Sequence, residues 1–144
     1  MPRAPPERIT HGGSNVNAPR ASMDGTGIFY KREQGDGPLL FQPLADGEAR
    51  PVIPCVRISS FSITSAGVYY VPCARAGEVP HDAPVRVFDP VTGKDRLFAM
   101  LDDIVSPAVG GLEGGLFASP DGRTLLYMRR HTRETDLMLI EHFR

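Results

Sequence analysis

Short apolar runs separated by polar turns recur along the chain, a pattern typical of β-strands joined by hairpins. The clearest unit lies near the C-terminus, where the turn Ser119–Gly122 precedes the apolar run Thr124–Met128. A polar loop, Arg129–Thr135, separates this run from a second one, Asp136–Ile140. A proline presets φ within the turn and a glycine takes its strained position, so a tight turn is expected. The pattern predicts antiparallel β-strands.

Two earlier segments repeat this unit. With an offset of 97 residues, Asp24, Gly25, Tyr30 and Leu40 of the first copy fall on Asp121, Gly122, Tyr127 and Leu137 of the last. The middle copy has Gly67 in a turn that is two residues shorter, followed by an apolar strand that contains Tyr70. We therefore treat Asp24, Gly25, Gly67, Asp121 and Gly122 as the turn residues of a structural repeat. Their two carboxylates are expected to accept hydrogen bonds from the backbone of their own turns.

Each copy is expected to hold about four strands, with one before the turn, one after it, one after the loop and one that closes the copy. The strands before the turns are Asn17–Ser22, Ser60–Thr64 and Gly115–Ser119. A helix over Phe98–Val105 is an alternative that Pro107 would stop. A helix over 134–144 is another, but this segment repeats a strand position of the other two copies. The expected fold class is therefore all-β.

The turn glycines at 25, 67 and 122 are spaced as in four-stranded blades of roughly 40–50 residues. The prediction is a partial β-propeller of about three four-stranded antiparallel blades over residues 8–144, at about 14–54, 55–106 and 107–144. Residues 1–7 are expected to be a disordered tail, and 8–13 a closing strand. The recurring tyrosines should pack between blades, as should several leucines, because one blade cannot bury both its faces. These residues are Tyr30, Tyr70, Tyr127, Leu125, Leu126, Leu137 and Leu139.

Charge and composition narrow the class of protein. Sixteen basic residues face seventeen acidic ones, which argues against a nucleic-acid partner, because such proteins carry a basic stripe. Fifteen glycines and fourteen prolines favour turns over long helices. No apolar run reaches 18 residues, so we expect no membrane insertion in this segment, and the N-terminus lacks an apolar core of the secretory type.

The two cysteines, Cys55 and Cys73, are 18 residues apart. We expect them to be small buried hydrophobic residues. A disulfide in an oxidising compartment is one alternative, and a metal site shared with a histidine is another. No CxxC or HxxxH spacing supports the metal site.

No motif for catalysis, cofactor binding or metal binding stands out, so an enzyme is not expected. His11–Gly13 resembles the oxyanion-hole loop of some hydrolases, but no G-x-S-x-G segment accompanies it. Gly110–Gly115 lacks the Lys-Ser/Thr of a phosphate-binding loop. The four histidines are scattered, and Asp102–Asp103 is interpreted as a solvated pair. The basic run Arg129–Arg133 is interpreted as a solvated hairpin tip, with contact to an acidic partner as the alternative.

The segment Phe117–Tyr127 with the ending Asp136–Arg144 resembles the terminal repeat of TolB-like, WD-repeat-like bacterial β-propellers, and weaker likeness extends over about residues 8–144. In such proteins the propeller follows a serine/threonine kinase domain or a winged-helix domain. The resemblance implies a ring of about six or more blades, and a scaffold that recognises a protein or a small ligand. It allows a periplasmic or a cytoplasmic location.

Two hypotheses about function and one about assembly follow. The first is a non-catalytic sensing or interaction module, the C-terminal part of a larger protein. The alternative is the propeller segment of a prolyl-oligopeptidase-like serine peptidase. For assembly, one hypothesis is that two chains complete a six-blade ring, with Arg8–Gly12 of one chain supplying the outer strand of the other's last blade. The alternative is a truncated gene product that is only marginally stable alone.

Overall fold

The computed structural model describes residues 5–10, 15–76, 82–102, 116–131 and 134–141, and within these ranges the fold is all-β with no helix. The all-β prediction is therefore confirmed. Both helix alternatives are wrong over the residues described, because Asp95–Asp102 and Glu134–Glu141 are strands.

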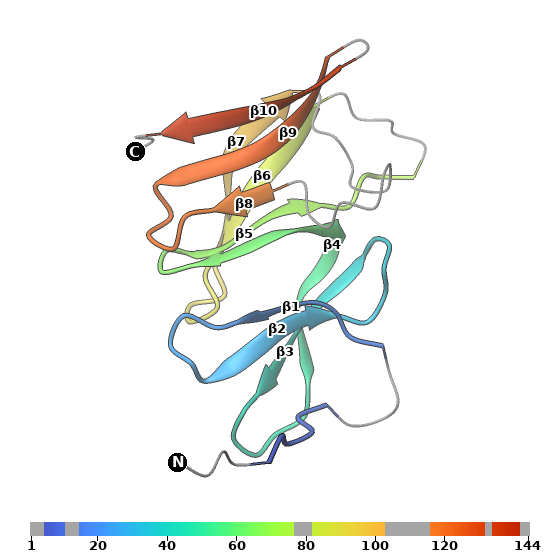
Figure 1. The fold of residues 1–144 in the computed structure, drawn as a ribbon, viewed down its shortest axis with the longest axis vertical. Helices are drawn as coiled ribbons and strands as arrows, with labels where there is room; N and C mark the ends of the chain where they lie inside the picture. The colour runs from blue at the N-terminus through green and yellow to red at the C-terminus, as the bar shows by residue number, and fades with distance from the viewer. Residues whose placement is uncertain (1–4, 11–14, 77–81, 103–115, 132–133, 142–144) are drawn as a thin grey trace.

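Seven strands form one antiparallel sheet in which every strand pairs with its neighbours in sequence (Figure 1). They are β1 (Asn17–Ala21), β2 (Gly27–Lys31), β3 (Gly37–Pro43), β4 (Arg50–Thr64), β5 (Gly67–Pro72), β6 (Asp82–Phe88) and β7 (Asp95–Asp102). A second sheet has the order β10-β9-β8 and consists of β8 (Leu116–Ala118), β9 (Thr124–His131) and β10 (Glu134–Glu141). The seven-stranded sheet curls, so that its first and last strands lie in differently oriented layers.

Strand β4 is the reason why the first seven strands form one sheet. Its N-terminal part pairs with β3, as in Leu39↔Ile53, and its C-terminal part pairs with β5, as in Phe61↔Tyr70. The register with β5 shifts between Val56 and Phe61, and Ile58 between them has a φ of 45°. The blade boundary expected at 54/55 therefore falls within one long, bent strand. The strands of the first two predicted blades, β1–β3 and β5–β7, belong to one sheet through β4.

A buried lysine holds this bend. Lys31 is 1% exposed, and its Nζ donates to the carbonyl oxygens of Gly35 (2.6 Å), Val56 (2.8 Å) and Ile58. The backbone N–H of Ile58 donates in turn to Asp36 Oδ1 at 3.0 Å. Burial lowers the pKa of the Lys31 ammonium group below its ordinary value, against the attraction of nearby carboxylates. The lysine thus bonds two carbonyls of β4 at the shift in register and one in the β2–β3 loop.

A disulfide closes the same region. Cys55 in β4 and Cys73 just after β5 are bonded, with their Cα atoms 5.5 Å apart. Both residues are only half-buried. The expectation of two small buried thiols is therefore wrong, and the disulfide alternative is correct. The physical reason is that β4 and β5 are paired strands, which brings these two positions within bonding distance.

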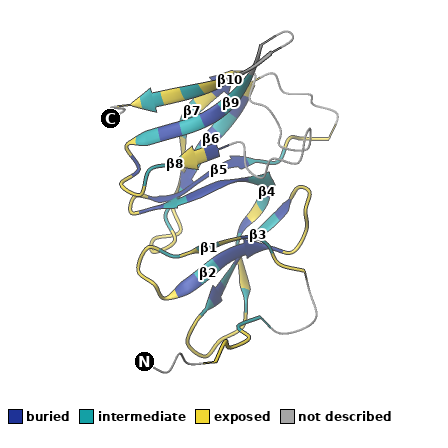
Figure 2. Ribbon diagram, in the orientation of Figure 1, coloured by how far each residue is buried: buried dark blue, intermediate teal, exposed yellow. Residues whose placement is uncertain are grey.

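Two apolar clusters lie on opposite faces of β5. Figure 2 shows that β5 itself is buried along most of its length. Val68 and Tyr70 point into the first cluster, which they share with Ala18, Phe29, Leu39, Ile53, Val56 and Phe61. Tyr69 and Val71 point into the second, which they share with Ala83, Val85, Val87, Leu101, Leu116, Leu125 and Tyr127. Strand β5 is therefore covered on both faces, by the β1–β4 layer on one side and by the three-stranded sheet on the other.

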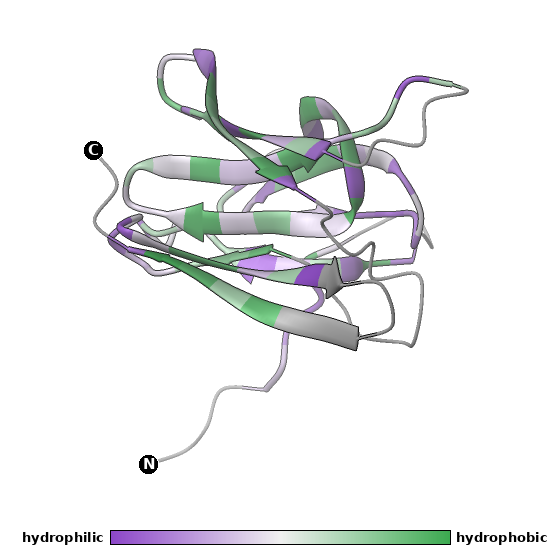
Figure 3. Ribbon diagram, turned by 90° about the horizontal axis from the view of Figure 1, so that it is seen from above, coloured by the Kyte–Doolittle hydropathy of each residue, from purple (hydrophilic) through white to green (hydrophobic). Residues whose placement is uncertain are grey.

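The outer face of the three-stranded sheet is open over the residues described. Leu137 is 67% exposed and Leu139 is 56% exposed, whereas Leu125 on the inner face is fully buried. Figure 3 shows how apolar and polar residues alternate along the strands. The expectation that Leu137 and Leu139 fill a space between blades is wrong for this structure, because no described segment covers that face.

The β8–β9 turn docks on the seven-stranded sheet through three hydrogen bonds. Ser65 N–H donates to the Pro120 carbonyl (2.8 Å), Ala118 N–H to Ser62 Oγ (2.9 Å), and the Tyr69 hydroxyl to the Gly122 carbonyl (3.3 Å). The fit is close, because a Cβ at Gly122 would lie 3.2 Å from the Tyr69 hydroxyl oxygen.

We expect Tyr69→Phe to lower the free energy of unfolding by about 1 kcal/mol, because it removes this buried hydrogen bond and keeps the ring. Urea denaturation followed by circular dichroism measures the change. Tyr30→Phe is the matched control, because the Tyr30 hydroxyl makes no hydrogen bond within the described part of the chain. An equal effect of both substitutions would show that the Gly122 contact contributes nothing.

Candidate functional site

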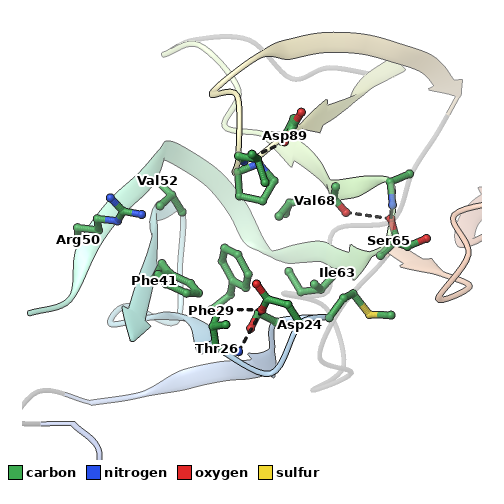
Figure 4. Close-up of a pocket in the computed structure, with 17 residues that line it drawn as sticks. Asp24, Thr26, Phe29, Phe41, Arg50, Val52, Ile63, Ser65, Val68 and Asp89 are labelled. Atoms are coloured by element: carbon green, nitrogen blue, oxygen red, sulfur yellow. Dashed lines mark hydrogen bonds between the residues drawn. The ribbon is translucent and has the colours of Figure 1, made fainter. Parts of the chain in front are cut away.

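A cleft of about 410 Å³ opens between three hairpin turns (Figure 4). The turns join β1 to β2, β4 to β5, and β6 to β7. Apolar side chains line its interior: Phe29, Phe41, Val52, Ile63 and Val68. Three charged residues also line it: Asp24, Arg50 and Asp89. An apolar interior with a few charged groups is the usual composition of a small-ligand site.

The cleft arises from a difference in turn length. Four residues separate Ser22 from Gly27, whose carbonyl accepts from Ser22 N–H, and four separate Ser119 from Thr124, which are joined in the same way. Only two residues separate Thr64 from its partner Gly67. The two-residue shortening of the middle turn, read from the sequence, is therefore present in the structure.

The equivalent space on the other face of β5 is filled. There the longer turn Ser119–Thr124 reaches Ser65 and the hydroxyl of Tyr69. In the cleft the shorter middle turn faces the turn after β1, and Phe29 occupies in β2 the position that Tyr69 has in β5. Phenylalanine has no hydroxyl with which to hold a turn. The short turn and the missing hydroxyl together leave the space open.

Asp24 supplies a negative charge at the cleft. Its Oδ1 accepts from the N–H (3.0 Å) and the hydroxyl (2.8 Å) of Thr26. Hydrogen bonding by Ser22, and then by Thr26, lowers the pKa of the Asp24 carboxyl to about 2. The side chain is exposed, so it presents a carboxylate to solvent at neutral pH.

Asp89 supplies a second carboxylate from the β6–β7 turn. It accepts from the Thr92 hydroxyl (2.7 Å) and from the Val91 N–H (2.8 Å). These bonds, with that from Thr92 first, hold the pKa of Asp89 below its ordinary value. Both carboxylates of the cleft are therefore ionised at neutral pH.

Aromatic rings and one cation form the opposite side. The rings of Phe29 and Phe41 are tilted, with their centroids 4.9 Å apart. The Arg50 guanidinium lies 6.0 Å from the centroid of Phe41, at the outer limit of a cation–π contact. In Figure 4 Arg50 lies at one end of the cleft, away from Asp24.

Acid titration tests the role of the Asp24 carboxylate. The folded pKa is about 2 and the ordinary value is 3.8, so its stabilising contribution is present above pH 4 and is lost as the pH falls towards 2. We expect Asp24→Asn to lower the urea midpoint at pH 6, with a difference from wild type that shrinks between pH 4 and pH 2. A difference that stays constant over this range would contradict the assignment.

The repeat turn residues occupy related but unequal positions. Gly25 and Gly122 have φ values of 71° and 70°, in the left-handed region that favours glycine. Gly67 is instead the first residue of β5, with a φ of 125°, so its register counterpart is Gly27 rather than Gly25. Asp121 Oδ1 accepts from the Arg123 N–H at 3.0 Å, as Asp24 does from Thr26.

The three repeat tyrosines share one register position, three residues after the start of the second strand of each group. All are at most 5% exposed. Tyr70 faces the β1–β4 layer, and Tyr127 faces the second cluster. Tyr30 lines a separate cavity with the N-terminal residues Ile9 and Thr10. Burial raises the pKa of Tyr70 to about 12, helped by the Asp95 carboxylate that accepts from its hydroxyl at 2.9 Å.

The structure gives few contacts for the other residues that the sequence singled out. Asp102 forms an ion pair with Arg129 at 2.8 Å. His11–Gly13, Gly110–Gly115 and Asp103 lie outside the described residues, as do the side chains of the rest of the basic run. Among the residues described, no group of three or more His, Cys, Asp or Glu side chains is placed to hold a metal ion. Nor does any helix there have the length and apolarity to cross a membrane.

Comparison with protein-family models finds no match for this chain, and neither does comparison with curated proteins.

Proposed function

We propose that the chain is a segment of a β-propeller-type scaffold that recognises a protein or a small ligand and carries no catalytic site of its own. The proposal rests mainly on the finding that the first strands of the three proposed blades are neighbours. These strands are β1, the C-terminal part of β4, and β8. β1 packs against β4, and β4 packs against β8. Side-by-side first strands, with later strands stepping outwards, are what blades around a common axis require.

Two further observations support this arrangement. Ala18 of β1 and Phe61 of the C-terminal part of β4 share one apolar cluster. Ala118 of β8 is hydrogen-bonded to Ser62 of the same part of β4. In this interpretation β4 is the outer strand of one blade and continues as the inner strand of the next.

The bonding of the cleft side chains supports recognition rather than catalysis. The Asp24 carboxylate is bonded to Thr26, the Asp89 carboxylate to its own turn, and the Thr64 hydroxyl to the Gly67 carbonyl at 2.9 Å. Groups tied to their own backbone hold the shape of the turns. A general acid or base instead needs a proton-transfer path to a substrate.

The open face of the third sheet supports association with a second copy. Phe117, Leu137 and Leu139 lie on this face and are 43%, 67% and 56% exposed. In the first two groups the third strand pairs with a fourth, whereas β10 has a single described neighbour, β9. A second chain that covers this face would extend the ring. The segment that contains Arg8 would then leave the cavity beside Tyr30 and pair with β10.

Light scattering coupled to size exclusion at micromolar concentration tests this assembly. We expect twice the mass of one chain for the wild type, and a monomer for Leu137→Lys, because a buried unpaired charge would oppose docking. Val91→Lys, at an equally apolar position that is 91% exposed on a distant turn, is the control and should remain a dimer. A wild-type monomer with a cooperative melt would contradict the assembly.

A further inference from the structure

We propose that the cleft between the β1–β2, β4–β5 and β6–β7 turns binds a small organic cation with an apolar body. This inference deepens the proposed recognition role and rests on it. It follows from the shape, the apolar interior and the charge of the cleft.

The size and lining of the cleft set the body of the ligand. A volume of about 410 Å³ lies at the lower end of the range for small-molecule sites. Phe41, Val52 and Ile63 are only half-buried and present apolar surface to this space, beneath which Phe29 and Val68 are buried (Figure 4). An aromatic or branched aliphatic group of roughly one ring fits such a surface, and its burial supplies the main favourable free energy.

The charges of the cleft set the sign of the ligand. Asp24 and Asp89 place two carboxylates around it, and Arg50 places one guanidinium. The guanidinium lies near the ring of Phe41 at one end, whereas Asp24 and Asp89 flank the centre in Figure 4. A cationic group over the apolar interior is therefore attracted by both carboxylates, and it is also favoured by the aromatic faces. An anionic group at the same place would be repelled.

The difference between turns explains why the described residues leave a cleft where β5 meets the β1–β4 layer. On the other face of β5, the turn Ser119–Thr124 occupies the corresponding space and is hydrogen-bonded to Ser65. The site is thus a consequence of the two residues by which the middle turn is shorter, together with the absence of a hydroxyl group on Phe29.

Two probes of matched shape test the inference: phenethylamine, which is protonated at pH 7, and 3-phenylpropionate, which is anionic. Methyl NMR spectra of the full chain follow Val52, Ile63 and Val68 during titration. We expect saturable shifts of these methyl groups with phenethylamine, and binding of 3-phenylpropionate weaker by about fivefold or more. Absence of saturable shifts with phenethylamine would overturn the inference.

Three variants locate the binding and test its sign. Asp24→Asn should weaken phenethylamine binding by about threefold, and Arg50→Gln should strengthen it by about twofold, because both charges are exposed and partly screened. Asp46→Asn, outside the cleft, is the control and should change nothing. Insertion of Asp-Gly between Ser65 and Ala66 restores the length of the other turns and should abolish the methyl shifts. Undiminished binding to this insertion variant would overturn the site.

The outcomes separate this inference from the proposed function. Equal or tighter binding of 3-phenylpropionate in the cleft would overturn the cationic ligand class, while recognition by the cleft would stand. Failure of both probes would overturn the inference, whereas the scaffold proposal is tested independently by the mass of the assembly.

Discussion

Replacing Lys31 with methionine should lower the free energy of unfolding by about 3 kcal/mol. The substitution keeps an unbranched apolar stem of similar length and removes the ammonium group that bonds three carbonyls. Each hydrogen bond from a charged donor contributes roughly 1.5–3 kcal/mol, and unsatisfied buried carbonyls carry a desolvation penalty. The variant no longer buries an ammonium group, and this gain in stability offsets part of the loss. Urea denaturation at pH 7 measures the difference.

The neighbouring Arg32 offers the matched control. Its side chain is exposed, so Arg32→Met changes the same charge next to the same strand and should alter stability by less than about 0.5 kcal/mol. A Lys31→Met variant as stable as Arg32→Met would show that the bend of β4 does not depend on the lysine. Such a result would show that the hydrogen bonds of Lys31 do not stabilise the shift in register within β4.

Reduction of the Cys55–Cys73 disulfide should lower the free energy of unfolding by about 3 kcal/mol. The bond closes a loop of 18 residues, and the entropy of the unfolded chain with and without such a loop differs by roughly this amount. The double variant Cys55→Ser with Cys73→Ser should show the same loss. Thermal melts with and without dithiothreitol measure it.

The double variant also provides the control for the reductant. Dithiothreitol should leave its melting temperature unchanged, since the structure describes no other cysteine in the chain. A wild-type chain that melts at the same temperature with and without reductant would contradict a stabilising role for this bond.

Local pattern predicted the strands well, because alternation and turn residues act over a few positions. The turn Ser119–Gly122 lies as expected, and the register places Tyr30, Tyr70 and Tyr127 at equivalent positions. The loop predicted at Arg129–Thr135 is too long, because β9 extends to His131 and β10 begins at Glu134, so Arg129 lies in a strand and not at a hairpin tip. The helix alternatives failed because β6 and β9 offered pairing partners to Asp95–Asp102 and Glu134–Glu141. Such partners are invisible in a segment read alone.

Features that depend on pairing across the sheet were not predictable in the same way. The bend of β4 depends on Lys31, which is 27 positions from the carbonyl of Ile58. From the sequence alone, an isolated lysine in a strand is expected to be exposed to solvent. The disulfide depends on the alignment of β4 with β5, which cysteine spacing does not specify. The cleft had one signal in the sequence, the middle turn that is two residues shorter, but its consequence appears only when the layers are packed.

Nuclear Overhauser effects test whether the first strands of the three proposed blades, β1, the C-terminal part of β4 and β8, lie side by side. We expect cross-peaks between the Ala18 methyl group and the Phe61 ring, and between the Ala118 amide proton and the side chain of Ser62. Absence of the second set, with intact cross-peaks within β8 and β9, would show a third sheet that is not docked on β4, and would contradict the arrangement.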